Sequence, residues 1–122
     1  MRKTIPVLGV AGAMIAGMLT LATPAAAHTM RAYVYTYAGF VVAAEAAVYD
    51  GHEHGYVCDR DADGLGVYGR FKLNDGKIYD VADSDGAGGT CPGFTAPTGK
   101  YITAFEAVLR SDPPRGSGWK TP

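Results

Sequence analysis

Residues 56–71 read YVCDRDADGLGVYGRF, and this stretch decides the fold that we predict for the chain. Two apolar and aromatic segments enclose an acidic turn that contains the pair Asp63-Gly64. Asp-Gly is a favoured pair in tight hairpins, because both central residues of such a turn need positive φ. We therefore predict a hairpin of two strands across residues 56–71, with Cys58 in its first strand.

The acidic turn also resembles the opening of a calcium-binding loop, in which carboxylates at alternate positions converge on the ion. These carboxylates are Asp59, Asp61 and Asp63. The twelfth position of such a loop needs a bidentate glutamate, but here it is Arg70, and the flanking segments resemble strands. The pattern therefore favours a solvated acidic turn, and we expect no cofactor. A looser calcium site completed by Asp83 or Asp85 is the alternative.

Three further Asp-Gly pairs divide the chain into short segments with alternating side-chain character: Asp50-Gly51, Asp75-Gly76 and Asp85-Gly86. Alternation with period two predicts strands. The predicted strands span residues 31–37, 40–49, 56–59, 65–73, 77–82 and 101–110. Segment 40–49 has enough alanine for a helix, but its valines and the turn after it favour a strand. About six short strands between turn signals predict an all-β, antiparallel sandwich.

The first 27 residues have the three parts of a secretory signal peptide. A basic start is followed by an apolar run and then by Ala25-Ala26-Ala27, so we expect cleavage after Ala27 and a secreted protein. The sandwich domain then spans residues 28–110. Residues 111–122 contain Pro113-Pro114 and two glycines, and we expect a flexible tail in which only Trp119 would dock.

The chain contains two cysteines, Cys58 and Cys91. An even number of cysteines in an exported chain indicates a disulfide bond. This bond would close a loop of about 34 residues, which stabilises a folded chain by about 3.5 kcal/mol in the chain-entropy model.

The charge and the residue pattern exclude several classes of function. Without Arg2 and Lys3, the chain keeps 9 of its 11 basic side chains and has 12 acidic ones, so its net charge is −3. Nucleic acids and anionic membranes need a basic surface, so we expect neither as a partner after signal cleavage. No serine lies in a G-x-S-x-G elbow, and oxidised cysteines are not nucleophiles. We therefore expect that the protein is not an enzyme.

A second metal-binding pattern is His52-Glu53-His54, because alternate histidines of a strand lie on one face. The three residues lie next to turn glycines at either side, where polar residues are common. We do not favour a metal at this position.

The hairpin sequence V-C-D-x-x-A-D-G, followed by Val67-Tyr68-Gly69 and a later cysteine, resembles small exported proteins of Streptomyces-type actinobacteria. Most proteins of this kind have no known function. The resemblance implies an extracellular location and a β fold. It also implies structural roles for Cys58, Asp63 and Gly64.

The tyrosines of the first predicted strand suggest a binding function, because tyrosine provides a large rigid surface with a polar tip. The candidate binding residues are Tyr33, Tyr35, Tyr37 and Phe94. We expect a monomeric domain that binds another secreted or cell-surface protein. It would be an adaptor subunit of an extracellular assembly, such as a toxin used in antagonism, or an inhibitor of a secreted enzyme. The alternative is a calcium-stabilised module that binds carbohydrate or the cell wall.

Overall fold

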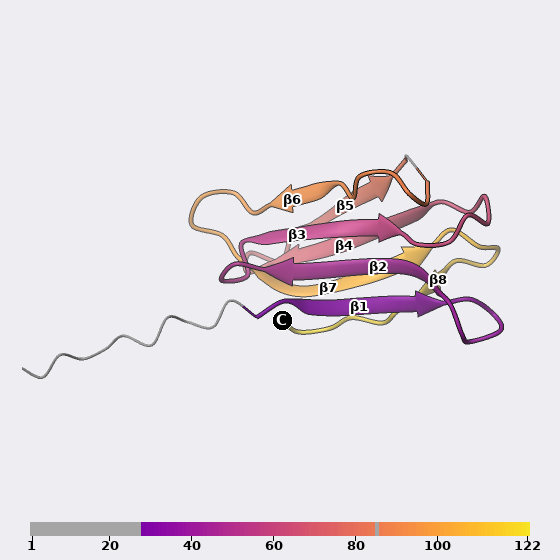
Figure 1. The fold of residues 1–122 in the computed structure, drawn as a ribbon. Coiled ribbons are helices and arrows are strands. Elements are labelled where there is room, and N and C mark those ends of the chain that lie inside the picture. The colour runs from indigo at the N-terminus through magenta and orange to yellow at the C-terminus, as the bar shows by residue number, and fades with distance from the viewer. Residues whose placement is uncertain (1–27, 85) are drawn as a thin grey trace, which may run out of the picture.

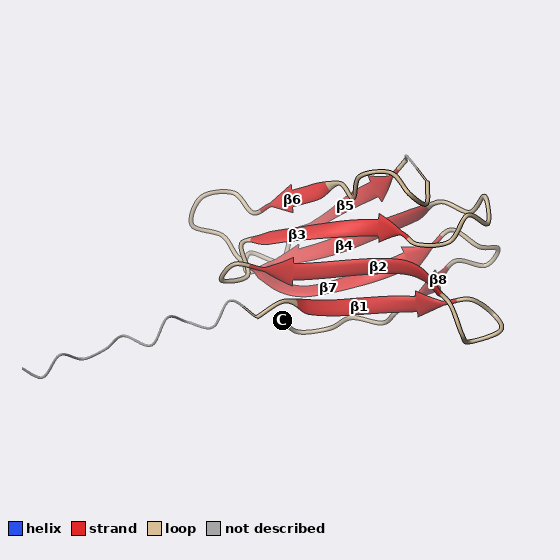
Figure 2. Cartoon of the chain, in the orientation of Figure 1, coloured by secondary structure: helices blue, strands red, loops and turns tan. Residues whose placement is uncertain are grey.

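A computed structural model of the chain describes residues 28–84 and 86–122 (Figure 1). The predicted signal peptide, residues 1–27, lies outside the described residues. The described part contains strands and loops without a helix (Figure 2). The strands are β1 (Met30–Tyr35), β2 (Val42–Tyr49), β3 (His54–Asp59), β4 (Val67–Leu73), β5 (Ile78–Asp83), β6 (Gly93–Thr95), β7 (Ile102–Leu109) and β8 (Arg115–Gly116).

The strands form two antiparallel sheets that pack face to face. The first sheet has the order β1-β2-β3-β6, and the second has the order β5-β4-β7-β8. The predicted all-β sandwich is therefore confirmed, with eight strands in place of about six. The two additional strands, β6 and β8, have three and two residues, which is too short to produce a period-two pattern.

The stretch 56–71 does not form the predicted hairpin. Strand β3 pairs with β2 and β6, whereas β4 pairs with β5 and β7, so the segment between them crosses from one sheet to the other. Gly64 has a φ of +72°, but Asp63 is not among the residues with positive φ. The Asp63 side chain instead accepts a hydrogen bond from the Leu65 N–H at 2.8 Å. The Asp-Gly pair is therefore part of an inter-sheet crossover.

The Asp50-Gly51 pair behaves as predicted. Both residues have positive φ, 48° and 64°, and the strands on either side, β2 and β3, pair with each other. The two Asp-Gly pairs therefore differ in backbone conformation although their sequences are the same. The strand after Asp50-Gly51 pairs with the strand before it, whereas the strand after Asp63-Gly64 pairs with strands of the other sheet.

The centre of the core is the ring of Phe71, which lies against two glycines. A Cβ atom at Gly55 would be 2.5 Å from Phe71 Cε1, and one at Gly69 would be 3.1 Å from Phe71 Cε2. The Phe94 ring stacks on Phe71 with a centroid distance of 5.1 Å. The two sheets approach closely at this point because neither glycine has a side chain. The other large side chains that are fully buried include Phe105, Leu73, Ile102, Val48, Val57 and Val67.

The predicted disulfide bond between Cys58 and Cys91 is present. It joins the end of β3 to the segment before β6, with 4.7 Å between the two Cα atoms. Next to it, the Val57 N–H donates a hydrogen bond of 3.1 Å to the Pro92 carbonyl. The disulfide and this bond hold Cys91 and Pro92 against the first sheet.

The sheet continues beyond the predicted domain end at Arg110. Residues of the predicted flexible tail form β8, which pairs with β7, and Lys120 forms a further bridge with Phe105. The two hydrogen bonds of this bridge measure 2.9 and 2.8 Å. Backbone groups supply these bonds, and a segment rich in glycine, serine and proline gives no side-chain pattern from which to predict them. Trp119 docks against Arg70, with 5.2 Å from the guanidinium carbon to the ring centroid.

Candidate functional site

The outer face of the first sheet carries two of the four aromatic side chains that were predicted to bind a partner, Tyr33 and Tyr35. Side chains alternate along each strand, so the residues on either side of the buried Ala32 and Val34 point outward. The outward aromatic residues are Tyr33, Tyr35, Tyr49, His54 and Tyr56. Neighbouring rings lie 5.6–6.2 Å apart between centroids. We call this surface the aromatic face.

The predicted binding residues fall into two groups. Tyr35 and Tyr37 are 47% and 76% exposed, and Tyr33 is half-buried on the same side of the sandwich. Phe94 does not lie with them, because its ring faces the core, where it packs on Phe71 and lies 5.3 Å from the Tyr79 ring. Phe94 is therefore partly buried as a packing residue, and a contact role for it stays a prediction.

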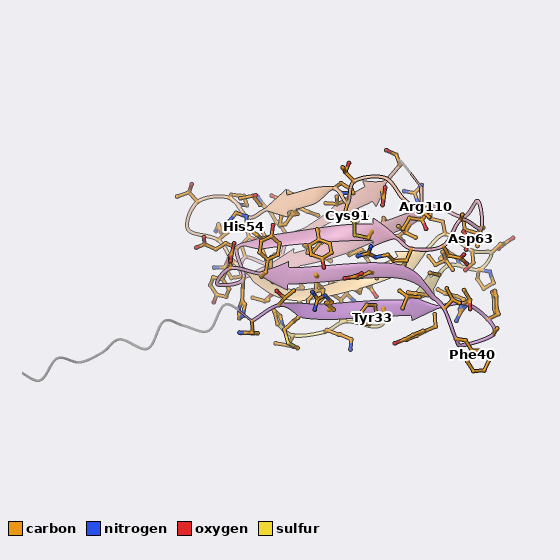
Figure 3. All side chains as sticks on the ribbon, viewed as in Figure 1. Tyr33, Phe40, His54, Asp63, Cys91 and Arg110 are labelled. Carbon is orange, nitrogen blue, oxygen red and sulfur yellow. A yellow bond between two sulfur atoms is a disulfide. The ribbon has the colours of Figure 1, made fainter. Side chains whose placement is uncertain are left out.

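The most exposed apolar side chains lie in the turn between β1 and β2. Phe40 is 90% exposed and Val41 is 50% exposed (Figure 3). The turn is ordered by two backbone hydrogen bonds of 2.8 Å, from Thr36 N–H to the Val41 carbonyl and from Gly39 N–H to the Thr36 carbonyl. We call Tyr37, Phe40 and Val41 the hairpin tip.

Sequence reasoning missed Phe40 and Val41 because it assigned both to a strand that begins at residue 40, whereas β2 begins at Val42. A usable signal was nonetheless present. Two apolar residues directly follow Gly39 between two strands, at a place where turns normally carry polar residues.

A buried carboxylate lies beneath the aromatic rings at the middle of the first sheet. Glu45 is 5% exposed, and its Oε1 accepts a hydrogen bond of 2.8 Å from the Tyr56 hydroxyl. Arg60 Nε donates to Oε2 at 2.8 Å, and Arg31 Nε lies 3.3 Å from Oε1. We call these four residues the Glu45 cluster.

Two pKa values in the Glu45 cluster depart from their ordinary positions. Burial raises the pKa of the Tyr56 hydroxyl, and its hydrogen bond to Glu45 acts in the same direction against the opposing effect of Arg31. The hydrogen bond that Arg31 donates to Tyr56 raises the pKa of Arg31. Tyr56 therefore stays a neutral donor and Arg31 stays charged.

The structure contains a pocket of about 440 Å³. Arg110, which lines it, lies towards the end of the sandwich that also carries Phe40 (Figure 3). The lining of the pocket also includes Asp59, Asp61 and Asp83. The Asp59 N–H donates to Asp83 Oδ2 at 2.8 Å, and the Asp61 N–H donates to Asp59 Oδ1 at 3.2 Å. Burial raises the pKa of the Asp59 carboxyl, and the neighbouring aspartates raise it further.

The three carboxylates of the predicted turn are not brought together as a calcium loop. Asp59 and Asp61 line the pocket, whereas Asp63 is exposed and accepts the N–H of Leu65. Among residues 28–84 and 86–122, no three His, Cys, Asp or Glu side chains form a group that would hold a metal ion.

The two histidines of the second metal pattern have other contacts. His54 Nδ1 lies 3.1 Å from the Thr95 hydroxyl, and its ring stacks on Tyr49. The His52 ring meets His28 edge to face at 5.4 Å. His54 is therefore part of the aromatic face, where its ring extends the row of tyrosines.

Comparison of the chain with protein-family models, with curated protein sequences and with solved structures gave no match. The described part of the chain also contains no helix that is long and apolar enough to cross a membrane. The fold thus defines a disulfide-bonded β-sandwich, and the features that bear on function are the side chains on its surface.

Proposed function

We propose that the protein is a secreted, non-catalytic domain that binds another extracellular protein through its hairpin tip. Its role is that of an adaptor subunit of an extracellular assembly or of an inhibitor of a secreted enzyme. The observation that carries the proposal is the exposure of Phe40, at 90%, beside Tyr37 at 76%. Large exposed apolar side chains that lie together are typical of interaction sites.

The energetics of the hairpin tip support a docking role. Complete burial of a phenylalanine side chain contributes about 1.5–3 kcal/mol, so Phe40 alone would provide a substantial part of a binding free energy. Hot spots of protein interfaces are rich in aromatic residues and arginine. The tip offers both, because the guanidinium carbon of Arg115 lies 4.3 Å from the centroid of the Tyr37 ring.

The tip is also held in place before a partner binds. The turn has its own backbone hydrogen bonds, and the Arg115 contact connects it to the segment that carries β8. An ordered loop loses less conformational entropy on binding than a flexible one, so more of the contact energy remains as affinity. This is the design of a binding loop on a rigid scaffold.

The nucleophilic side chains support a non-catalytic role. Cys58 and Cys91 are joined to each other. Ser111 and Ser117 donate their hydroxyl protons to the carbonyls of Pro113 and Gly118, at 2.8 and 2.9 Å. A serine nucleophile needs a histidine as its base, and neither serine has this arrangement. The disulfide and the N-terminal pattern support secretion.

The proposal is tested by photo-cross-linking from the tip. Benzoyl-phenylalanine replaces Phe40 in the tagged secreted protein, and extracellular fluid of the source organism is irradiated with it. The control carries the same group at Tyr101, which is 48% exposed near the turn between β4 and β5, at the opposite end of the sandwich. We expect one protein to cross-link from Phe40 and not from Tyr101.

The identified partner then allows a measurement of affinity. We expect Phe40→Ser to weaken binding at least tenfold, since loss of a buried aromatic contact costs about 1.4 kcal/mol or more. Tyr101→Ser should leave the affinity unchanged. Identical cross-links from the two ends, or an unchanged affinity of the Phe40 variant, would show that the tip is not the interface.

A further inference from the structure

We propose that Arg31 and Arg60 form a carboxylate-binding site that accepts an acidic side chain of the protein partner. This inference rests on the proposed function and names the chemistry of the partner. The supporting observation is the geometry with which Arg31 and Arg60 contact Glu45.

Each of the two arginines contacts Glu45 through its own Nε atom. Arg60 Nε lies 2.8 Å from one oxygen of the carboxylate, and Arg31 Nε lies 3.3 Å from the other. A guanidinium has two terminal amino groups in addition to Nε. The side-chain hydrogen bonds of Arg31 and Arg60 within residues 28–84 and 86–122 are donated by Nε, to Tyr56 and to Glu45. Glu45 thus holds each guanidinium through Nε, while about half of each arginine side chain, 47%, remains exposed to solvent.

The cluster also carries more positive than negative charge. Two guanidiniums surround one carboxylate, and Tyr56, whose pKa is raised by burial, adds a neutral donor. Each arginine side chain is 47% exposed, whereas the Glu45 side chain is 7% exposed. One unit of positive charge therefore remains at the surface of a sheet in a chain whose overall net charge is −1.

The chemistry of the guanidinium selects the ligand. Its planar, paired donors match the two oxygens of a carboxylate, and such charge-assisted hydrogen bonds are about twice as strong as neutral ones. The arginines need no reorientation on binding, because Glu45 already holds them. The ligand that fits this arrangement is a carboxylate that approaches from solvent between the aromatic rings.

The position of the site favours a protein as the source of the carboxylate. Tyr33 is the cross-strand neighbour of Glu45, and Tyr35 follows on the same strand, two residues before the hairpin tip. Tyr33 and Tyr35 thus lead along β1 from Arg31 towards the hairpin tip. A tyrosine- and arginine-rich area beside an apolar anchor has the composition of a protein interface. An acidic wall polysaccharide is the competing source.

The test compares two probes of matched charge, a capped hexaglutamate peptide and a hexagalacturonate, at low salt. Binding is followed by the NMR signals of the Arg31 and Arg60 Nε–Hε groups in the full secreted protein. We expect saturable shifts of both signals with the peptide. We also expect about tenfold weaker binding for Arg31→Gln and for Arg60→Gln, since loss of one charge-assisted bond costs at least about 1.5 kcal/mol.

A matched control is Arg110→Gln, because Arg110 is exposed and stacks over Tyr68, 5.2 Å from the ring centroid, without a glutamate partner. This variant should bind the peptide as the wild type does. Tighter binding of hexagalacturonate than of the peptide, or equal loss with Arg110→Gln, would overturn the inference.

Glu45→Gln separates orientation from simple attraction. The substitution removes a negative charge, so a surface that merely attracts anions would bind the peptide more tightly. A site in which Glu45 orients the arginines would bind it more weakly, which is the result that we expect. Circular dichroism tests whether the Glu45→Gln variant is folded. If it is unfolded, Arg31→Gln and Arg60→Gln still test independently whether the two arginines bind the peptide.

Failure of this inference is distinguishable from failure of the proposed function. The peptide titration does not involve Phe40, so Phe40→Ser should retain peptide binding while it loses the cross-linked partner. Suppose that Phe40→Ser loses the partner and that the wild type shows no peptide binding at Arg31 or Arg60. This result would reject the carboxylate site and leave the docking role of the hairpin tip intact.

Discussion

Each sheet of the sandwich buries one glutamate on its outer face, and the two surroundings differ. Glu45 of the first sheet is 5% exposed and is held by Arg31 and Arg60, which are open to solvent. Glu106 of the second sheet is 8% exposed and is held by Arg70 alone, at 3.1 Å. Arg70 also contacts Asp80 at 3.3 Å, so its charge is shared between two acids.

The residues that lie next to the two glutamate–arginine pairs differ as well. The C-terminal segment extends the second sheet along the edge of β7, where Trp119 stacks on Arg70 and Gly116 lies so close to Glu106 that a Cβ atom would be 2.9 Å from its Oε2. Arg70 is 33% exposed, whereas Arg31 and Arg60 are each 47% exposed. The comparison indicates that the arginine of the second sheet is more fully engaged within the chain than the two arginines of the first.

The largest expected effect comes from the disulfide, which ties only the first sheet. Replacement of Cys58 and Cys91 by alanine should lower the free energy of unfolding by about 3.5 kcal/mol, because the unfolded chain regains the freedom of a loop of about 34 residues. Urea unfolding monitored by tyrosine fluorescence gives the value. A loss below about 1 kcal/mol would mean that backbone contacts such as Val57 to Pro92 hold the segment before β6 in place without the covalent bond.

The next effect compares the two glutamates directly. Glu45→Ala should cost about 2 kcal/mol, because it leaves the Tyr56 hydroxyl without its acceptor and two guanidiniums without their carboxylate partner. Glu106→Ala should cost about 1 kcal/mol, because Arg70 keeps Asp80. Chemical denaturation of both variants under identical conditions is the measurement. The reverse order of the two losses would contradict the account of the first face.

A smaller effect is expected from the Trp119 contact of the second sheet. Trp119→Ala removes a cation–π contact with Arg70 from a tryptophan that is 44% exposed. Such contacts contribute about 0.5–1 kcal/mol at exposed sites. The melting temperature should fall slightly, and the peptide titration should detect no new anion site, because two acids still hold Arg70. New peptide binding at Arg70 would show that the Trp119 contact, and not the charge balance, separates the faces.

The smallest effect concerns a buried acid that has no arginine. Asp59 is 8% exposed, and its folded-state pKa is raised by burial above the ordinary value of 3.8. Its ionisation therefore opposes folding above that raised pKa. This penalty is relieved as the pH falls through the folded pKa and is absent below about 3.8. Asp59→Asn should be slightly more stable than the wild type at pH 7, and the difference should vanish near pH 3 in urea titrations.

Much of the fold was readable from local pattern. The alternating segments, the Asp50-Gly51 hairpin and the two cysteines predicted an all-β sandwich with the Cys58–Cys91 disulfide, and each of these is present. Strands β6 and β8 were missed because their pairing depends on backbone groups of segments without a side-chain pattern. Of the candidate binding residues, Tyr35 and Tyr37 are exposed, whereas the ring of Phe94 packs on Phe71, and their roles in binding stay predictions.

By itself, the sequence determined the class of fold, because period two and turn residues are local properties that each segment carries independently of its neighbours. Only the tertiary structure decided that residues 56–71 cross between sheets, since two identical Asp-Gly pairs differ in the partners that their strands find. It also decided that Arg31 and Arg60, far apart in sequence, meet at Glu45. Contacts of this kind depend on sheet order, which no local pattern encodes.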